Sequence, residues 1–174
     1  PLSIHAGRNE FCAQLDNGSA ACWGQNADGQ FGLGNTTSQT SPIALTLPTG
    51  RTIASMSMAK DFICIPLDNG SVVCAGRNTE FQIGQGTTSA AELSWKYVIG
   101  LDMVAHSVEL GQDVGCAHLV NGSMACWGED VWGLFGNSTT SYTLRVASTA
   151  TQYANFGNGR TAASISLNYR HACA

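Results

Sequence analysis

Residues 11–32 read FCAQLDNGSAACWGQNADGQFG, and the same pattern returns twice more without gaps. It reappears as ICIPLDNGSVVCAGRNTEFQIG at residues 63–84 and as GCAHLVNGSMACWGEDVWGLFG at residues 115–136. Each copy has two cysteines that flank an Asn-Gly-Ser triplet, and successive copies are 52 residues apart. Self-similarity at a fixed period of this length is typical of repeat architectures. We therefore expect one structural unit per copy.

A fourth unit is predicted to begin at about residue 165. GRTIASMSM, residues 50–58, leads into the second copy and returns as GRTAASISL at residues 159–167. The final HACA then matches the opening of a unit, with Cys173 in the position of the first cysteine. We expect the partner of Cys173 to fall ten residues further on, past Ala174. The odd cysteine count of seven therefore indicates that the sequence is cut within a unit.

The Asn-Gly pair predicts a β-hairpin in each copy. With a three-residue loop that has Gly18 in the left-handed conformation, Cys12 lies directly opposite Cys22. The Cα atoms of a non-hydrogen-bonded antiparallel pair are about 4.5 Å apart, which is within disulfide range. We therefore expect three intra-hairpin disulfides, each contributing roughly 3 kcal/mol by closing a small loop. The expected bonds are Cys12–Cys22, Cys64–Cys74 and Cys116–Cys126.

Short strands and glycine-rich turns predict an all-β fold. After each hairpin comes a glycine-punctuated segment, such as GQNADGQFGLG at residues 24–34, and then a second pair of short strands. Such strands, repeating every 52 residues, fit a β-propeller with about four strands per blade. We expect residues 1–174 to form a single partial propeller of about 3–3.5 blades, with units centred on 11–32, 63–84 and 115–136. A linear solenoid is the weaker alternative.

Composition argues against a nucleic-acid partner and against a membrane-spanning helix. Charged residues make up 11% of the chain, only two of them are lysines, and the net charge is −4. This leaves no basic field to attract nucleic acid, so we expect no nucleic-acid partner. The sequence also lacks the run of about 18 apolar residues that a membrane-spanning helix needs. Paired cysteines in every unit favour an oxidising environment, so we predict a secreted or cell-surface protein.

The stretch CAQLDNGSAACWGQNADGQFGLG, residues 12–34, resembles the repeat of the regulator of chromosome condensation family, and in particular its cysteine-bearing extracellular branch. The resemblance covers nearly the whole chain. It departs from the family pattern at Ala75, where Trp is usual, at Phe81, where Gly is usual, and at Leu134, where Gln is usual. The resemblance implies a propeller, commonly of seven blades, which would need about 364 residues at this period. The chain is therefore similar to half of such a propeller.

The resemblance implies a fold without implying one function. The family includes a nucleotide exchange factor for a small GTPase that docks on chromatin, a secreted inhibitor of β-lactamases, and many surface proteins. The residues that this chain shares with the family lie in turns, disulfides and blade packing. No catalytic residue can be carried over, because fold alone does not determine function.

We predict no catalytic, cofactor-binding or metal-ligating residue. Cysteines ten positions apart do not have zinc spacing. The segment from Asn26 to Gly29 resembles the start of a calcium loop, but no glutamate closes it. The resemblance to the family places it in a glycine turn, so we interpret it as a turn. Asp61 and Asp113 share one repeat position, which Asn9 occupies in the first unit, and this substitution favours a turn over acid–base chemistry. Trp95 and Trp132 are predicted to pack in loops rather than to bind a sugar.

Five Asn-x-Ser/Thr acceptors make N-linked glycan a candidate modification. Asn35 and Asn137 lie in polar Ser/Thr-rich loops and are the better candidates. Asn17, Asn69 and Asn121 are the weaker ones, because the hairpin turn needs Asn-Gly for its geometry in any case.

Our leading functional hypothesis is a non-enzymatic extracellular module with a structural or protein-interaction role. It would be part of a larger secreted or cell-surface protein or of a filamentous assembly. Its partners would be other proteins, further copies of the chain or the rest of the propeller. The first alternative is a secreted inhibitor or ligand-binding propeller. A second alternative, an intracellular exchange factor that binds chromatin, is disfavoured by the scarcity of lysine.

Overall fold

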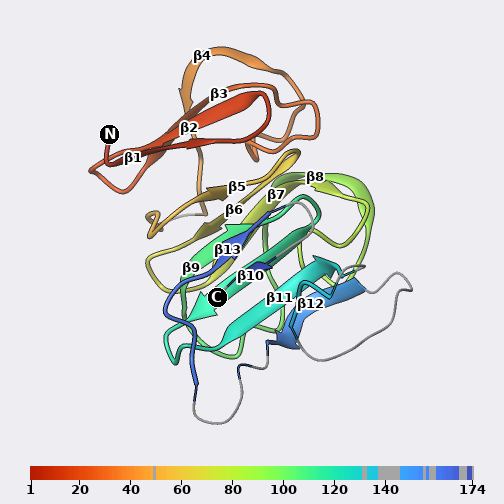
Figure 1. The fold of residues 1–174 in the computed structure, drawn as a ribbon. Helices are drawn as coiled ribbons and strands as arrows, with labels where there is room; N and C mark the ends of the chain where they lie inside the picture. Colours follow the sequence, from red (N-terminus) through yellow and green to blue (C-terminus); the bar gives the residue numbers. More distant parts are fainter. Residues whose placement is uncertain are drawn as a thin grey trace.

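Each of the three Asn-Gly-Ser units forms one four-stranded antiparallel sheet in the computed structural model (Figure 1). The model describes residues 1–48, 50–130, 133–136, 146–154, 156, 160–168 and 172–173. The strands of each sheet follow one another in chain order, as in a propeller blade. We name these sheets blades 1, 2 and 3.

The strands have the following bounds. Blade 1 consists of β1 (Ser3–Ala6), β2 (Glu10–Gln14), β3 (Ala20–Gly24) and β4 (Gln39–Ala44). Blade 2 consists of β5 (Ser57–Met58), β6 (Phe62–Pro66), β7 (Val72–Asn78) and β8 (Ser89–Tyr97). Blade 3 consists of β9 (Ala105–Leu110), β10 (Val114–Leu119), β11 (Met124–Glu129) and β12 (Val146–Tyr153). A separate two-stranded sheet is formed by β13 (Ser166–Leu167) and β14 (Ala172–Cys173).

The central hairpins have the predicted register. Cys12 faces Cys22 across β2 and β3, and their Cα atoms are 4.1 Å apart. The Gly18 N–H donates to the Leu15 carbonyl at 3.1 Å, and Gly18 has a φ of 77°, as a three-residue loop requires. The Cys64–Cys74 and Cys116–Cys126 pairs repeat this geometry. The expected all-β fold with intra-hairpin disulfides is therefore confirmed.

The disulfides lie between the blades rather than at their edges. Because side chains alternate along a strand, each sheet has one face with the cysteines and one without them. The cysteine face of blade 1 packs against the Ile63, Ile65 and Val73 side chains of blade 2. The cysteine face of blade 2 packs in the same way against Ala117 and Trp127 of blade 3. All six paired cysteines are fully buried, so each bridge also contributes to an interface between blades.

The innermost strands of the successive sheets contact one another: β1 meets β5, β5 meets β9, and β9 meets β13. The blades therefore share a common inner side, and the turns that follow these strands lie at one end of it (Figure 1). The Asn-Gly-Ser turns lie at the opposite end of the central hairpins. This polarity gives the assembly two different ends, which we call the inner-turn end and the Asn-Gly end.

One departure from the family pattern coincides with unusual backbone geometry. Phe81 has a φ of 59°, in the left-handed region that Gly29 and Gly133 occupy in the other units. Among the described residues Phe81 is the non-glycine residue with a positive φ. The turn geometry is thus retained even where the glycine that usually permits it has been replaced.

Removal of one disulfide should destabilise the chain strongly. The double substitution Cys64→Ala/Cys74→Ala should lower the free energy of unfolding by about 3 kcal/mol, because the loop constraint on the unfolded chain is lost. Urea denaturation would measure this change. The control is Cys173→Ser, because Cys173 is exposed and has no disulfide partner among the described cysteines. A loss of similar size in that control would contradict the structural role of the bridge.

Glycine at the end of β7 is required by close backbone contact. A Cβ atom added at Gly76 would lie 2.4 Å from the carbonyl oxygen of Asp61, and the φ of Gly76 is 116°. Gly34 also has a positive φ, yet a Cβ atom there would meet nothing within 4 Å. Gly76→Ala should therefore cost more than about 3 kcal/mol in unfolding free energy, and Gly34→Ala only about 1 kcal/mol. Equal losses in thermal denaturation would refute this reading.

Candidate functional site

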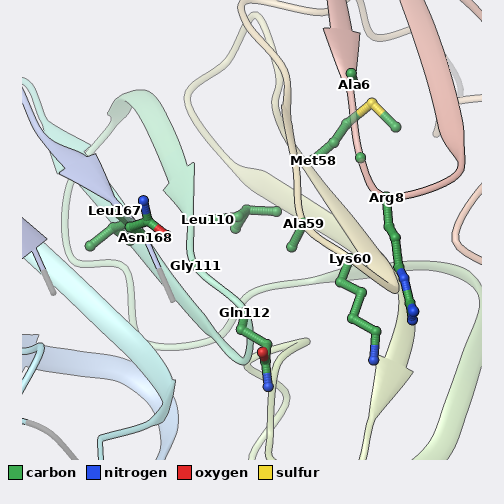
Figure 2. Close-up of a pocket in the computed structure, with 11 residues that line it drawn as sticks. Ala6, Arg8, Met58, Ala59, Lys60, Leu110, Gly111, Gln112, Leu167 and Asn168 are labelled. Atoms are coloured by element: carbon green, nitrogen blue, oxygen red, sulfur yellow. The ribbon is translucent and has the colours of Figure 1, made fainter. Parts of the chain in front are cut away.

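Four chain segments meet around a cavity of about 480 Å³ at the inner-turn end (Figure 2). They are residues 6–8, 58–60, 110–112 and 167–168, which follow or end the innermost strands β1, β5, β9 and β13. The first three segments occupy the same repeat position, 52 residues apart. The cavity is therefore a consequence of the repeat, because equivalent turns of successive units converge on one point.

The cavity has apolar walls and a polar rim. Met58, Leu110 and Leu167 come from one repeat position and line its interior. Two positions further on, Arg8, Lys60 and Gln112 stand at its edge. Figure 2 shows these three long side chains extending in the same direction from their turns. The arrangement can hold a group that combines an apolar part with a hydrogen-bonding or charged part.

The cations at the rim are not equally engaged. The Lys60 Nζ lies 3.2 Å from the Asp61 Oδ2, and an Arg77 guanidinium nitrogen lies 3.5 Å from the same oxygen. The Arg8 side chain is exposed and makes no ion pair with any described residue. Arg8 is therefore available to a ligand, whereas Lys60 shares the Asp61 carboxylate with Arg77.

The aspartates singled out from the sequence lie beside this rim. Asp113 accepts hydrogen bonds from the amide nitrogens of Gln82, at 3.0 Å, and of Gln112, at 2.7 Å. Gln82 is itself fully buried and lies in the loop after β7. Asp61 and Asp113 thus join the inner turn of one blade to neighbouring side chains. These contacts agree with a structural role for the position.

Glu10 is a buried carboxyl group that the sequence analysis did not single out. Its side chain is 1% exposed, its Oε2 accepts the Asn9 N–H at 2.8 Å, and its Oε1 has no hydrogen-bond partner. Burial, with a smaller contribution from the Asp61 charge, raises the pKa of Glu10 to about 6 against the opposing effect of backbone hydrogen bonds. The equivalent residues are Phe62 and Val114, so comparison between units could have revealed it as a polar residue in an apolar position.

The turn interpretation of Asn26 agrees with its contacts. Asn26 is buried, and its Oδ1 accepts the Phe31 N–H at 2.9 Å. Asn78 and Asp130 occupy the same repeat position and make the same type of bond to residues five positions later. A side chain that closes its own loop in this way is a turn anchor. Among the described residues no three His, Cys, Asp or Glu side chains are grouped to hold a metal ion.

Two histidines from unrelated repeat positions come together at the Asn-Gly end. His106 and His118 lie edge to face with ring centroids 6.1 Å apart, beside a second cavity of about 420 Å³. His118 Nε2 lies 2.9 Å from the Ala162 carbonyl oxygen, which fixes its ring. Trp95 packs against the core between blades 1 and 2, as predicted, but it lies in strand β8 and not in a loop. Trp132 lies outside the described residues.

The Asn-Gly-Ser acceptors share one local geometry. In each of the three turns the Asn Oδ1 accepts hydrogen bonds from the backbone N–H and the hydroxyl of the Ser two residues later, at 2.6–3.2 Å. These residues are the exposed Asn17, Asn69 and Asn121. Asn35 is also exposed, and its Oδ1 accepts the Thr37 N–H at 2.9 Å. Asn137 lies outside the described residues, and glycosylation of all five stays a prediction.

Comparison with known proteins identifies the repeat. The family model for the regulator of chromosome condensation (RCC1) repeat matches residues 17–65. The chain contains an RCC1 repeat. The matched segment runs from the Asn-Gly turn of blade 1 into β6, so it spans the junction between two RCC1-like blades. This agrees with the resemblance found in the sequence.

Solved RCC1-like propellers have the same fold. The structure of yeast RCC1 (Prp20) bound to Kap60 matches 98% of this chain with a TM-score of 0.85 and 19% identity, and the match covers 40% of that protein. Human WBSCR16 matches 83% of this chain, with a TM-score of 0.71, 19% identity and 37% of its own length covered. The ectodomain of the receptor kinase CR4 from Physcomitrella patens matches 98% of this chain with a TM-score of 0.58 and 16% identity. The match covers 36% of that ectodomain.

These matches establish the fold as a partial RCC1-like β-propeller. The chain spans about two-fifths of the length of these solved structures. In the part of the chain that the structure describes, no helix has the length and apolar character needed to cross a bilayer.

Titration of Glu10 should make stability depend on pH. Because its pKa is raised from 4.5 to about 6 in the folded state, the folded protein binds this proton more tightly than the unfolded chain. The stability that this bound proton contributes is fully present below about pH 4.5 and is lost as the pH rises through 6. Glu10→Gln should therefore raise the unfolding free energy at pH 8 by about 2 kcal/mol and leave it nearly unchanged at pH 4. Urea denaturation at both pH values measures this, and a pH-independent difference would contradict it.

Proposed function

We propose that this chain is a non-enzymatic extracellular module of a larger secreted or cell-surface protein, and that it binds a protein partner at its inner-turn end. One observation carries the proposal: each of the three four-stranded blades contains a buried disulfide. Structural disulfides form and persist in oxidising compartments and are rare in the cytosol.

Burial of the bridges strengthens the argument for an oxidising compartment. The six sulfur-bearing residues are fully buried and occupy the interfaces between blades. The same fold occurs in an extracellular setting in the receptor-kinase ectodomain from Physcomitrella patens. The fold is therefore compatible with the compartment that the disulfides favour.

A binding role is supported by the architecture and by what related folds bind. Yeast RCC1 (Prp20) is seen bound to Kap60, and Prp20p has been studied for its binding to Gsp1p and histones. Repeated turns that converge on one surface give this chain a place where a protein can dock. The net charge of −4 argues against nucleic acid as the partner.

Glycan on the Asn-Gly-Ser turns would leave the inner-turn end free, whereas Asn35 lies in the loop after β3, which starts at the inner-turn end. The Asn17, Asn69 and Asn121 turns all lie at the Asn-Gly end, away from the cavity between the inner turns. We propose glycan at Asn35 and Asn137 first, and at the turn asparagines second. We also propose that residues 1–174 act as one partial propeller that further blades complete.

The compartment can be tested directly by disulfide mapping. Chain directed to the secretory pathway should give the linked peptides 12–22, 64–74 and 116–126 under non-reducing conditions. Reduction should lower the midpoint of thermal unfolding by more than about 10 °C, since three loop constraints are lost. Free thiols at these six positions in protein from its native source would overturn the extracellular proposal.

The same protein should be tested against the exchange-factor alternative. We expect it to leave the rate of nucleotide release from a small GTPase unchanged, measured with a fluorescent GDP analogue. A GTPase preparation with its own exchange factor serves as the positive control. Acceleration of release by this chain would contradict the interaction-module proposal.

A further inference from the structure

We propose that the three Asn-Gly-Ser turns are modification sites that the folded repeat keeps closed. When a turn opens, its asparagine converts spontaneously to aspartate or isoaspartate, and while the turn is held the asparagine is protected. The asparagines concerned are Asn17, Asn69 and Asn121, all of which are exposed to solvent. The reaction consumes only water, so it is independent of the proposed binding function.

The chemistry is that of an asparagine followed by glycine. The backbone nitrogen of the glycine loses its proton and attacks Cγ of the asparagine, a C–N bond forms, and the bond to the side-chain nitrogen breaks to release ammonia. Water then opens the resulting succinimide at either carbonyl, which gives aspartate or isoaspartate. Glycine favours the attack because it has no side chain to shield its nitrogen. Each of the three turns carries such a pair.

In the folded turn the attacking nitrogen is already engaged. The Gly18 N–H donates to the Leu15 carbonyl at 3.1 Å, and the equivalent bonds of Gly70 and Gly122 are both 2.8 Å long. The nitrogen has to give up this bond together with its proton before it can attack. The hydrogen bond that closes the loop therefore also lowers the reactivity of the glycine nitrogen.

The side-chain carbonyl under attack is held as well. Asn69 Oδ1 accepts the Ser71 N–H at 3.2 Å and the Ser71 hydroxyl at 2.7 Å, and the other two turns contain the same pair of bonds. Rotation of the asparagine side chain toward the glycine nitrogen breaks both bonds. The turn thus restrains the nucleophile and the electrophile separately.

The following unit holds each turn from outside. Ile53, Ala105 and Ala162 lie at one repeat position, and each donates its N–H to the carbonyl of a turn glycine at 2.8–2.9 Å. The residues that precede these donors lie against the same glycines, and they are Thr52, Val104 and Thr161. Opening of a turn therefore requires the neighbouring unit to move too, which makes the open state rare.

Isoaspartate would make the opening irreversible. In isoaspartate the backbone runs through the side-chain carbons, so the loop gains one backbone atom. A three-residue loop is what places Cys64 opposite Cys74. Because the lengthened loop no longer satisfies that register, a bridge that has been reduced cannot re-form once its turn has reacted.

Peptide mapping by mass spectrometry measures the protection. The disulfide-bonded protein is made in a bacterial periplasm, so that no N-linked glycan blocks the asparagines, and is incubated at mildly alkaline pH. Reduction with dithiothreitol in urea should speed deamidation about a hundredfold at all three turns, because several hydrogen bonds are lost. The Asn-Gly pair at residues 158–159, which lies outside the described residues, gives the rate of an unprotected pair in urea. Equal rates in folded and unfolded protein would overturn the proposal.

One substitution tests the restraint within a single turn. Ser71→Ala removes the hydroxyl donor to Asn69 and should speed its deamidation about fivefold in the folded protein. Asn17 and Asn121 of the same molecules are internal controls and should keep their rates, as should Asn69 itself in urea. An unchanged or slower reaction at Asn69 would refute protection by the turn, since a slower one means that the hydroxyl assists the attack. Equal acceleration at all three turns would show a general loss of stability and refute it too.

Reoxidation tests the irreversible step. The reduced protein is incubated until part of it has reacted, and it is then returned to oxidising conditions without urea. Isoaspartate at position 69 should be concentrated in molecules that lack the 64–74 bridge, while aspartate at that position should be found in molecules with and without it. Equal isoaspartate content in bridged and unbridged molecules would overturn the inference.

Discussion

The cross-strand disulfide in each central hairpin is the constraint on which the rest of the molecule depends. It fixes the register of two strands, and that register decides which side chains occupy each face of the sheet. Because the bridge is also buried between neighbouring sheets, it sets the packing of one unit on the next. Local chemistry within eleven residues of sequence therefore determines contacts between segments about 52 residues apart.

The two ends of the assembly follow from this packing. Innermost strands that contact one another bring their outgoing turns to a common place, and the Asn-Gly turns are left at the other end. Residues that hold the fold, such as Asn26 and Asp113, close loops or join blades through hydrogen bonds. Arg8 makes no ion pair with the described residues, whereas Lys60 and Arg77 both pair with Asp61.

Sequence alone predicted the features that depend on local geometry. The pairing of Cys12 with Cys22 followed from loop length and strand periodicity, and the turn role of Asn26 followed from the resemblance to the family's glycine turn. The cavity was missed, because no local pattern shows that residues 8, 60 and 112 meet at one rim. Glu10 was missed for a related reason: its burial arises only in the folded sheet, and only comparison with Phe62 and Val114 marks it as unusual.

The alternation of faces has an evolutionary consequence. Blade 1 presents its cysteine face to Ile63 and Val73, and blade 2 presents its own cysteine face to Trp127 and its neighbours. Every unit thus has a cysteine face that packs on the next unit and an opposite face that packs on the unit before it. A duplicated or deleted segment of one period would meet complementary surfaces on both sides, so unequal recombination between the coding repeats can change the number of blades without a new interface having to arise.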